Sequence, residues 1–126
     1  MNREPAMKRP VRVVIGISGA SGAAIGLRVL ELLAEARPIE THLVVSPAAE
    51  RTLVAEIGPD APARARALAS FCHDHRDIGA SIASGSFRTA GMIIAPCSIR
   101  SLCAIAYGQL ADLLIHLVAR GRGGVD

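Results

Sequence analysis

The amino-acid sequence predicts a single α/β domain built on a parallel sheet. Three apolar segments, residues 11–17, 41–45 and 91–95, are each followed by a short loop rich in serine, glycine or proline and then by a segment with helical propensity. Strands that alternate with helices in this way pair in parallel through right-handed crossovers. The chain has 126 residues, 51% hydrophobic but only 2% aromatic, so we expect a core of Ala, Val, Leu and Ile.

The first strand and the first helix are separated by a glycine-rich loop. Residues 11–17 form a nearly continuous apolar run, which is typical of a strand covered on both faces. Residues 22–36 repeat apolar side chains at helical spacing, and Arg37-Pro38 ends the pattern. The side chains expected on the buried face of this helix are Ile25, Val29, Leu32 and Leu33.

The loop between these elements, residues 18–22, has the composition of an anion-binding turn. Small residues let backbone N–H groups approach a phosphate, and the start of the helix adds donors and a favourable dipole. The hydroxyls of Ser18 and Ser21 are candidate donors to the same anion. The glycines are spaced three residues apart, which matches neither the dinucleotide fingerprint nor the P-loop, so a tight turn without a ligand is the alternative.

The second strand leads into a capped helix. Residues 41–45 are apolar or β-branched apart from His42, which is expected at a half-buried position of the sheet. Serine is a favoured N-cap and proline a favoured first helical residue, so Ser46 and Pro47 predict a helix that ends near residue 57.

The third strand follows the least regular part of the chain. Residues 63–71 have helical propensity, and 72–77 are predicted as a polar loop. The alternating histidines and aspartates of this loop rarely face one ion, so it is expected to be solvated and not a metal site. Residues 91–95 are predicted as a third buried strand, and 99–107 as a helix.

Hydroxyl side chains follow all three predicted strands. They are Ser18, Ser21, Ser46 and Ser98. Because the carboxyl ends of parallel strands meet at one edge of a sheet, we expect these loops to converge on one ligand site.

Charge and cysteine content exclude several classes of protein. The net charge is +3, but the basic residues are scattered and not interleaved with aromatic side chains, so we expect no nucleic-acid groove. No apolar run is long enough to span a bilayer. Three cysteines without paired spacing are typical of a reduced, cytoplasmic protein, and Cys97 and Cys103 are expected as small buried residues.

Four segments closely resemble the UbiX/Pad1 flavin prenyltransferases. They are GISGASGA at residues 16–23, ETHLVVS at 40–46, ASIASGSF at 80–87 and GMIIAPCSI at 91–99. The resemblance runs in order from residue 8 to 112, and several motifs that match together are more specific than any one of them.

This resemblance implies a three-layer, flavodoxin-like or Rossmann-like parallel sheet, incomplete at the C-terminus, in a homo-oligomer. It implies a flavin prenyltransferase that transfers dimethylallyl from its monophosphate to reduced FMN and supplies prenylated FMN to a UbiD-type decarboxylase. No metal is required in that family.

The resemblance also implies which residues form the site. The implied cofactor-binding residues are Gly19, Ala20, Ser21, Ser46, Ser98, Ile99, Arg100 and Ser101. Ser21 and Glu56 match positions that assist proton and phosphate handling near flavin N5, because a carboxylate can accept a proton and a hydroxyl can stabilise a departing phosphate. Considered without the resemblance, Glu56 is equally a solvated charge at a helix end.

The end of the chain departs from that family. We assign residues 1–10 to a polar leader, 11–112 to a flavin-binding α/β domain and 113–126 to an atypical Gly/Arg tail, which we interpret as the result of truncation or a frameshift. Two alternatives stay open. One is a degenerate FMN-binding fragment without activity; the other is a relative of the FMN-dependent cysteine decarboxylases, which would need a catalytic histidine on the second helix.

Overall fold

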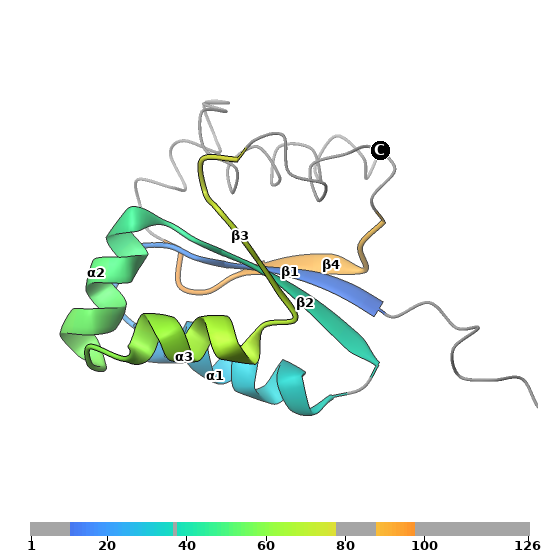
Figure 1. Ribbon diagram of the computed structural model, residues 1–126, viewed down its shortest axis with the longest axis horizontal. Helices are drawn as coiled ribbons and strands as arrows, with labels where there is room; N and C mark the ends of the chain where they lie inside the picture. Colours follow the sequence, from blue (N-terminus) through green and yellow to red (C-terminus); the bar gives the residue numbers. More distant parts are fainter. Residues whose placement is uncertain (1–10, 37, 78–87, 98–126) are drawn as a thin grey trace, which may run out of the picture.

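The computed structural model describes residues 11–36, 38–77 and 88–97. In this part of the chain, four parallel strands form one sheet and three helices cover one of its faces (Figure 1). In chain order the elements are β1 (Val11–Ile17), α1 (Ala23–Glu35), β2 (Ile39–Val45), α2 (Pro47–Glu56), α3 (Ala61–Leu68), β3 (Phe71–His73) and β4 (Gly91–Ile94). The predicted α/β class with a parallel sheet is confirmed.

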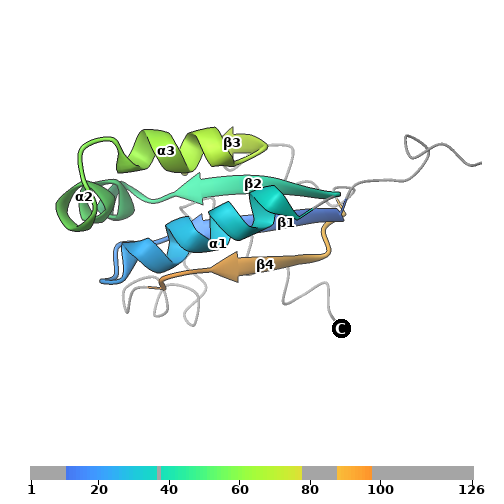
Figure 2. The same cartoon turned by 90° about the horizontal axis from the view of Figure 1, so that it is seen from below.

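The strands lie in the order β3-β2-β1-β4, so the chain builds outward on one side of β1 and then crosses to the other (Figure 2). β1 pairs with β2 from Val11 to Ile17 and with β4 from Val13 to Gly16. Open α/β sheets bind ligands at the carboxyl ends of the strands where the order reverses. In this sheet that point lies between β1 and β4.

The core lies between the sheet and the helices. Its largest fully buried side chains on this side of the sheet are Ile15, Ile17, Leu30, Leu43 and Leu53. Each such aliphatic side chain stabilises the fold by about 1.5–3 kcal/mol relative to exposure. Because side chains alternate along a strand, Arg12 and Val14 of β1 face the opposite side of the sheet.

Helix α1 buries a different face from the predicted one. Its buried residues are Ala23, Gly26, Leu27 and Leu30. Val29 and Leu33 are partly buried as expected, but Ile25 and Leu32 are 59% and 49% exposed. A Cβ atom at Gly26 would collide with the backbone carbonyl that follows β4. The helix therefore lies close to the sheet at Gly26, with Leu27 and Leu30 buried on the same face, and the predicted positions of Ile25 and Leu32 were wrong.

The two edge strands also differ from the prediction. β3 lies where the sequence predicts the end of a helix and a polar loop, and it pairs with β2 through Phe71 opposite His42. Its three residues are too few to show a strand pattern, so pairing with β2 decides their conformation. β4 is a strand as predicted, but Ile93 is 38% exposed because β4 is an edge strand of the described sheet.

Helix α2 begins at Pro47 after its N-cap Ser46, as predicted, and α3 corresponds to the segment with helical propensity. None of the helices within the described ranges has the length and hydrophobicity needed to cross a membrane. The predicted helix 99–107, the tail 113–126 and a third layer from those segments lie outside the described residues.

Candidate functional site

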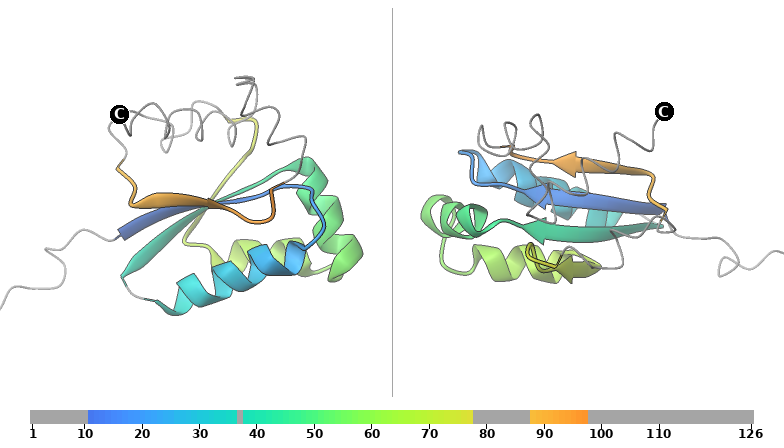
Figure 3. Two further views of the ribbon diagram at one scale, coloured as in Figure 1. Left: turned by 180° about the vertical axis from the view of Figure 1, so that it is seen from behind. Right: turned by 90° about the horizontal axis from the view of Figure 1, so that it is seen from above.

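The loops that follow three of the strands meet at one edge of the sheet, as predicted. The Ser46 N–H donates to the Ile17 carbonyl over 3.0 Å, which joins the ends of β1 and β2. The Ser18 N–H donates to the Pro96 carbonyl over 3.2 Å, which joins the ends of β1 and β4. Figure 3 shows these loops and the start of α2 at the same end of the sheet. Of the predicted cofactor residues, Ser98, Ile99, Arg100 and Ser101 lie outside the described residues.

Ser18 has a structural contact in place of the predicted ligand contact. Its side chain is fully buried, and its hydroxyl donates to the Pro96 carbonyl over 2.7 Å. The hydroxyl hydrogen is therefore used inside the protein, where it holds the end of β1 against the segment after β4. The expectation that Ser18 donates to a bound anion was wrong, because a backbone carbonyl 78 residues away takes that hydrogen bond.

Ser21 and Glu56 lie in direct contact, although 35 residues separate them in the chain. The Ser21 hydroxyl donates to Glu56 Oε2 over 2.9 Å, and the backbone N–H groups of Gly22 and Ala23 both donate to Glu56 Oε1 over 3.0 Å. The N-cap of α1 is Gly22, with φ +100°, which has no side chain to cap the helix. A carboxylate from α2 therefore takes that role.

These hydrogen bonds keep Glu56 in its charged form. The Ala23 N–H, the Ser21 hydroxyl and the Gly22 N–H, in decreasing order, lower the pKa of Glu56 below its ordinary value of 4.5. Glu56 is exposed but is more than a solvated charge at a helix end. Its carboxylate also takes the first N–H groups of α1, so these groups are not open to a phosphate as the sequence suggested.

The rest of the β1–α1 loop is held against α2. A Cβ atom at Gly19 would collide with the side chain of Ala48, so only glycine allows this approach. The Thr52 hydroxyl lies 3.2 Å from the Gly19 carbonyl oxygen and 2.9 Å from that of Ala48. Thr52 is not among the residues predicted from the sequence. The available signal was the spacing of four residues between Ala48, Thr52 and Glu56, which places them on one side of a helix.

Ser46 caps α2 as predicted. Its hydroxyl oxygen accepts from the Ala49 N–H over 3.1 Å, and its side chain is half-buried beside the end of β1. A serine hydroxyl carries one donor and two acceptor sites, so the cap does not use its hydrogen. Ser46 can therefore cap the helix and donate to a ligand at the same edge.

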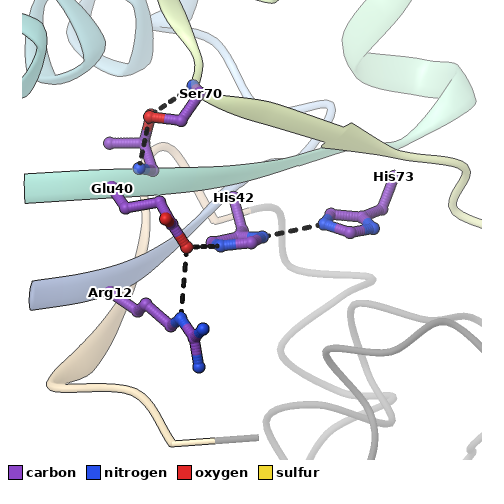
Figure 4. A network of polar contacts seen from close by, with 6 residues as sticks. Arg12, Glu40, His42, Ser70 and His73 are labelled. Carbon is purple, nitrogen blue, oxygen red and sulfur yellow. Dashed lines mark hydrogen bonds and ion pairs between the residues drawn. The ribbon is translucent and has the colours of Figure 1, made fainter. Parts of the chain in front are cut away.

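A polar network lies on the face of the sheet opposite α1 (Figure 4). Glu40 Oε1 is 3.1 Å from Arg12 Nε and 2.8 Å from His42 Nε2, and His42 Nδ1 is 2.9 Å from His73 Nε2. His42 is 4% exposed, so it is buried more deeply than the sequence indicated, and its ring stacks on Phe71 with centroids 4.9 Å apart.

The surroundings of this network lower the pKa values of two of its members, Glu40 and His73. The hydrogen bond from His42, aided by Arg12, lowers the pKa of Glu40. Burial, together with the charge of His42, lowers the pKa of His73, and Asp77 opposes this shift.

A cleft of about 460 Å³ lies on the β2–β3 side of the sheet, away from the β1–β4 switch point. Leu43, Val45 and Pro47 line it, and Arg66 forms an ion pair with Glu50 across it. Its two arginines are thus already paired with carboxylates, because Arg76 also pairs with Asp74 over 3.1 Å.

No arrangement of His, Cys, Asp or Glu within the described residues could hold a metal ion. Cys97 is exposed, contrary to the expectation of a small buried residue.

The family model described as Flavoprotein matches residues 1–124. The flavin prenyltransferase UbiX of Escherichia coli K12 is 52% identical over 104 residues, which cover 82% of this chain and 54% of that protein. The chain thus spans about half the length of such relatives.

Two solved structures share the fold. One is AnUbiX (PadA1) in complex with FMN and dimethylallyl pyrophosphate, at 41% identity and a TM-score of 0.80, covering 88% of this chain and 58% of that one. The other is a dodecameric FMN-dependent UbiX-like decarboxylase from Escherichia coli O157:H7, at 39% identity and a TM-score of 0.81, covering 86% and 58%. The predicted resemblance and the predicted fold class are confirmed.

Proposed function

Because this chain belongs to the flavoprotein family, we propose that it binds FMN where the loops after β1, β2 and β4 meet. The observation that carries the proposal is the pair of hydrogen bonds that joins Ser46 to Ile17 and Ser18 to Pro96. These contacts bring the loops to the point where the strand order reverses, which is where open α/β sheets take nucleotides.

The residues present at this edge fit an anionic nucleotide. Gly19 and Ala20 are half-buried and small, which allows a ligand to approach the backbone. Ser46 carries a hydroxyl hydrogen that its capping bond does not use. We assign flavin binding to Gly19, Ala20, Ser21 and Ser46, together with Ser98, Ile99, Arg100 and Ser101.

We propose further that the chain carries the flavin-binding part of a flavin prenyltransferase. Reduced FMN, when bound, supplies the nucleophilic ring that accepts a dimethylallyl group from its monophosphate. We assign proton transfer to Ser21 and Glu56, and the observation that supports this is the hydrogen bond from the Ser21 hydroxyl to Glu56 Oε2. As Ser21 Oγ takes a proton from the reacting group, its own proton passes to the ionised carboxylate.

If the chain were a relative of the cysteine decarboxylases, it would need a catalytic histidine on the second helix. Helix α2 reads PAAERTLVAE and has none. If the chain were an FMN-binding fragment without activity, it would bind FMN in the same way but would not catalyse prenylation. The dodecameric relative supports a homo-oligomer. The further proposal that the product is supplied to a UbiD-type decarboxylase rests on the sequence resemblance alone. Location in the cytoplasm stays a prediction.

Two measurements test the proposal. FMN added to the purified chain should bind and lose fluorescence, and anaerobic incubation with reduced FMN and dimethylallyl monophosphate should give a flavin of higher mass. The variant Ser70→Ala should give the same result as the original chain in both measurements, because the Ser70 hydroxyl contacts Thr41 in the sheet and not the loops. A folded chain that ignores FMN would overturn the proposal, and binding without a mass gain would leave only the inactive fragment.

A further inference from the structure

We propose that Thr52 is a positioning residue that orients the Gly19–Ala20 peptide toward the flavin nucleotide. The inference rests on the proposed function, since it concerns the same loop. It assigns a role to a side chain that the resemblance does not single out.

Helix α2 contacts the β1–α1 loop with one side. Ala48, Thr52 and Glu56 are spaced by four residues and therefore lie above one another on the helix. Ala48 leaves no room for a side chain at position 19, and Glu56 binds the last part of the loop and the first N–H groups of α1. Thr52 lies between these two contacts, and its one hydroxyl hydrogen is shared between the Ala48 carbonyl at 2.9 Å and the Gly19 carbonyl at 3.2 Å.

The contact of Thr52 fixes the direction of one peptide group. In a planar trans peptide the C=O and the following N–H point in opposite directions. Because the Gly19 carbonyl points to Thr52 on α2, the Ala20 N–H points away from α2. Within the described residues, no hydrogen bond engages this N–H, and Ala20 is only half-buried. A half-buried donor of this kind suits a phosphate oxygen of a nucleotide.

A change of Thr52 to valine isolates this effect, because the two side chains have nearly the same shape. Without the hydroxyl, the Gly19 carbonyl loses its partner on α2, and the peptide can turn its N–H away from the ligand. The loss of one hydrogen bond predicts FMN affinity about fivefold lower in Thr52→Val. Thr52→Ser keeps the hydroxyl and should restore affinity to within about twofold of the original chain.

The matched control is Thr41→Val. Thr41 also loses a hydroxyl contact on this change, but its partner is Ser70, away from the loop. Fluorescence titration with FMN and thermal unfolding are measured for the original chain and all three variants. We expect reduced FMN affinity in Thr52→Val alone. If the role of Thr52 were merely structural, FMN affinity would fall in both valine variants, in proportion to their loss of stability.

The outcomes separate the two proposals. Failure of the original chain to bind FMN overturns the proposed function and this inference with it. Binding by the original chain and equal binding by Thr52→Val overturns only the role of Thr52. If Thr52→Val does not fold, the Ala20 amide resonance of the ¹⁵N-labelled original chain decides: it should shift when FMN is added, and an unshifted resonance would overturn the inference.

Discussion

Ser21 and Glu56 form a hydrogen-bonded pair across the β1–α1 loop, with 2.9 Å between the serine hydroxyl and Glu56 Oε2. The same carboxylate accepts from two backbone N–H groups at the start of α1. One side chain of α2 therefore does two things: it caps α1, and it holds the serine hydroxyl in place.

Glu56→Gln should lower the rate of flavin prenylation by a factor of about 10² or more, because the amide cannot accept a proton through Ser21. FMN affinity should change much less, since the amide oxygen still accepts from the loop. The rate is measured by mass analysis of the flavin product. Glu50→Gln is the matched control on the same helix, and it should keep the original rate because Glu50 pairs with Arg66. A rate for Glu56→Gln equal to that of Glu50→Gln would contradict the proposed proton transfer.

The contribution of Glu56 to stability should depend on pH in a defined direction. Its pKa is lowered in the folded chain, so the unfolded chain binds the proton more readily. The stabilisation is therefore complete above the ordinary value of 4.5 and is lost as the pH falls through the folded-state pKa. Denaturant unfolding of the original chain and of Glu56→Gln should show a constant difference above that pH and a shrinking one below it. A difference that grows on acidification would be inconsistent with the cap.

His73 should make the chain less stable in mild acid. Burial and the nearby His42 lower its pKa below 6.5, so between these two pKa values the unfolded chain binds more protons than the folded one. Stability is complete above pH 6.5 and falls as the pH decreases through the folded-state value. We expect His73→Gln to show a flatter dependence of unfolding free energy on pH than the original chain. The neighbouring change His75→Gln provides the control, and an equally flat profile there would remove the assignment to His73.

Gly26→Ala should destabilise the chain by about 1–3 kcal/mol through overpacking, even though alanine favours helix by about 1 kcal/mol. The added Cβ would meet the Ala95 carbonyl oxygen, a backbone atom that cannot move alone, and it would lie 3.2 Å from the Ile17 side chain. Gly91→Ala is the control, because a Cβ there meets no atom within 4 Å and should change stability by less than about 0.5 kcal/mol. Chemical denaturation of both variants measures the difference, and equal stability would argue against the close contact of α1 with the sheet.

The sequence by itself determined the features that depend on neighbouring residues. The apolar runs of β1 and β2, the Ser46-Pro47 start of α2 and the glycine loop before α1 follow from local conformational preference and spacing. The convergence of the loops was also predictable, because parallel strands always bring their carboxyl ends to one edge. The composition of the loop indicated Ser21 as a candidate donor, whereas only the resemblance indicated Glu56 as a partner in proton transfer.

Only the tertiary structure decided which groups meet across the sheet and between the helices. The Ser18 hydroxyl binds Pro96, Glu56 reaches the start of α1, and His73 reaches His42 because distant segments pack together. The buried face of α1 belongs in the same class, since it depends on how closely Gly26 lets the helix approach. Hydrogen bonds and steric contacts between distant segments depend on positions in space, and hydrophobic spacing along the chain does not encode those positions.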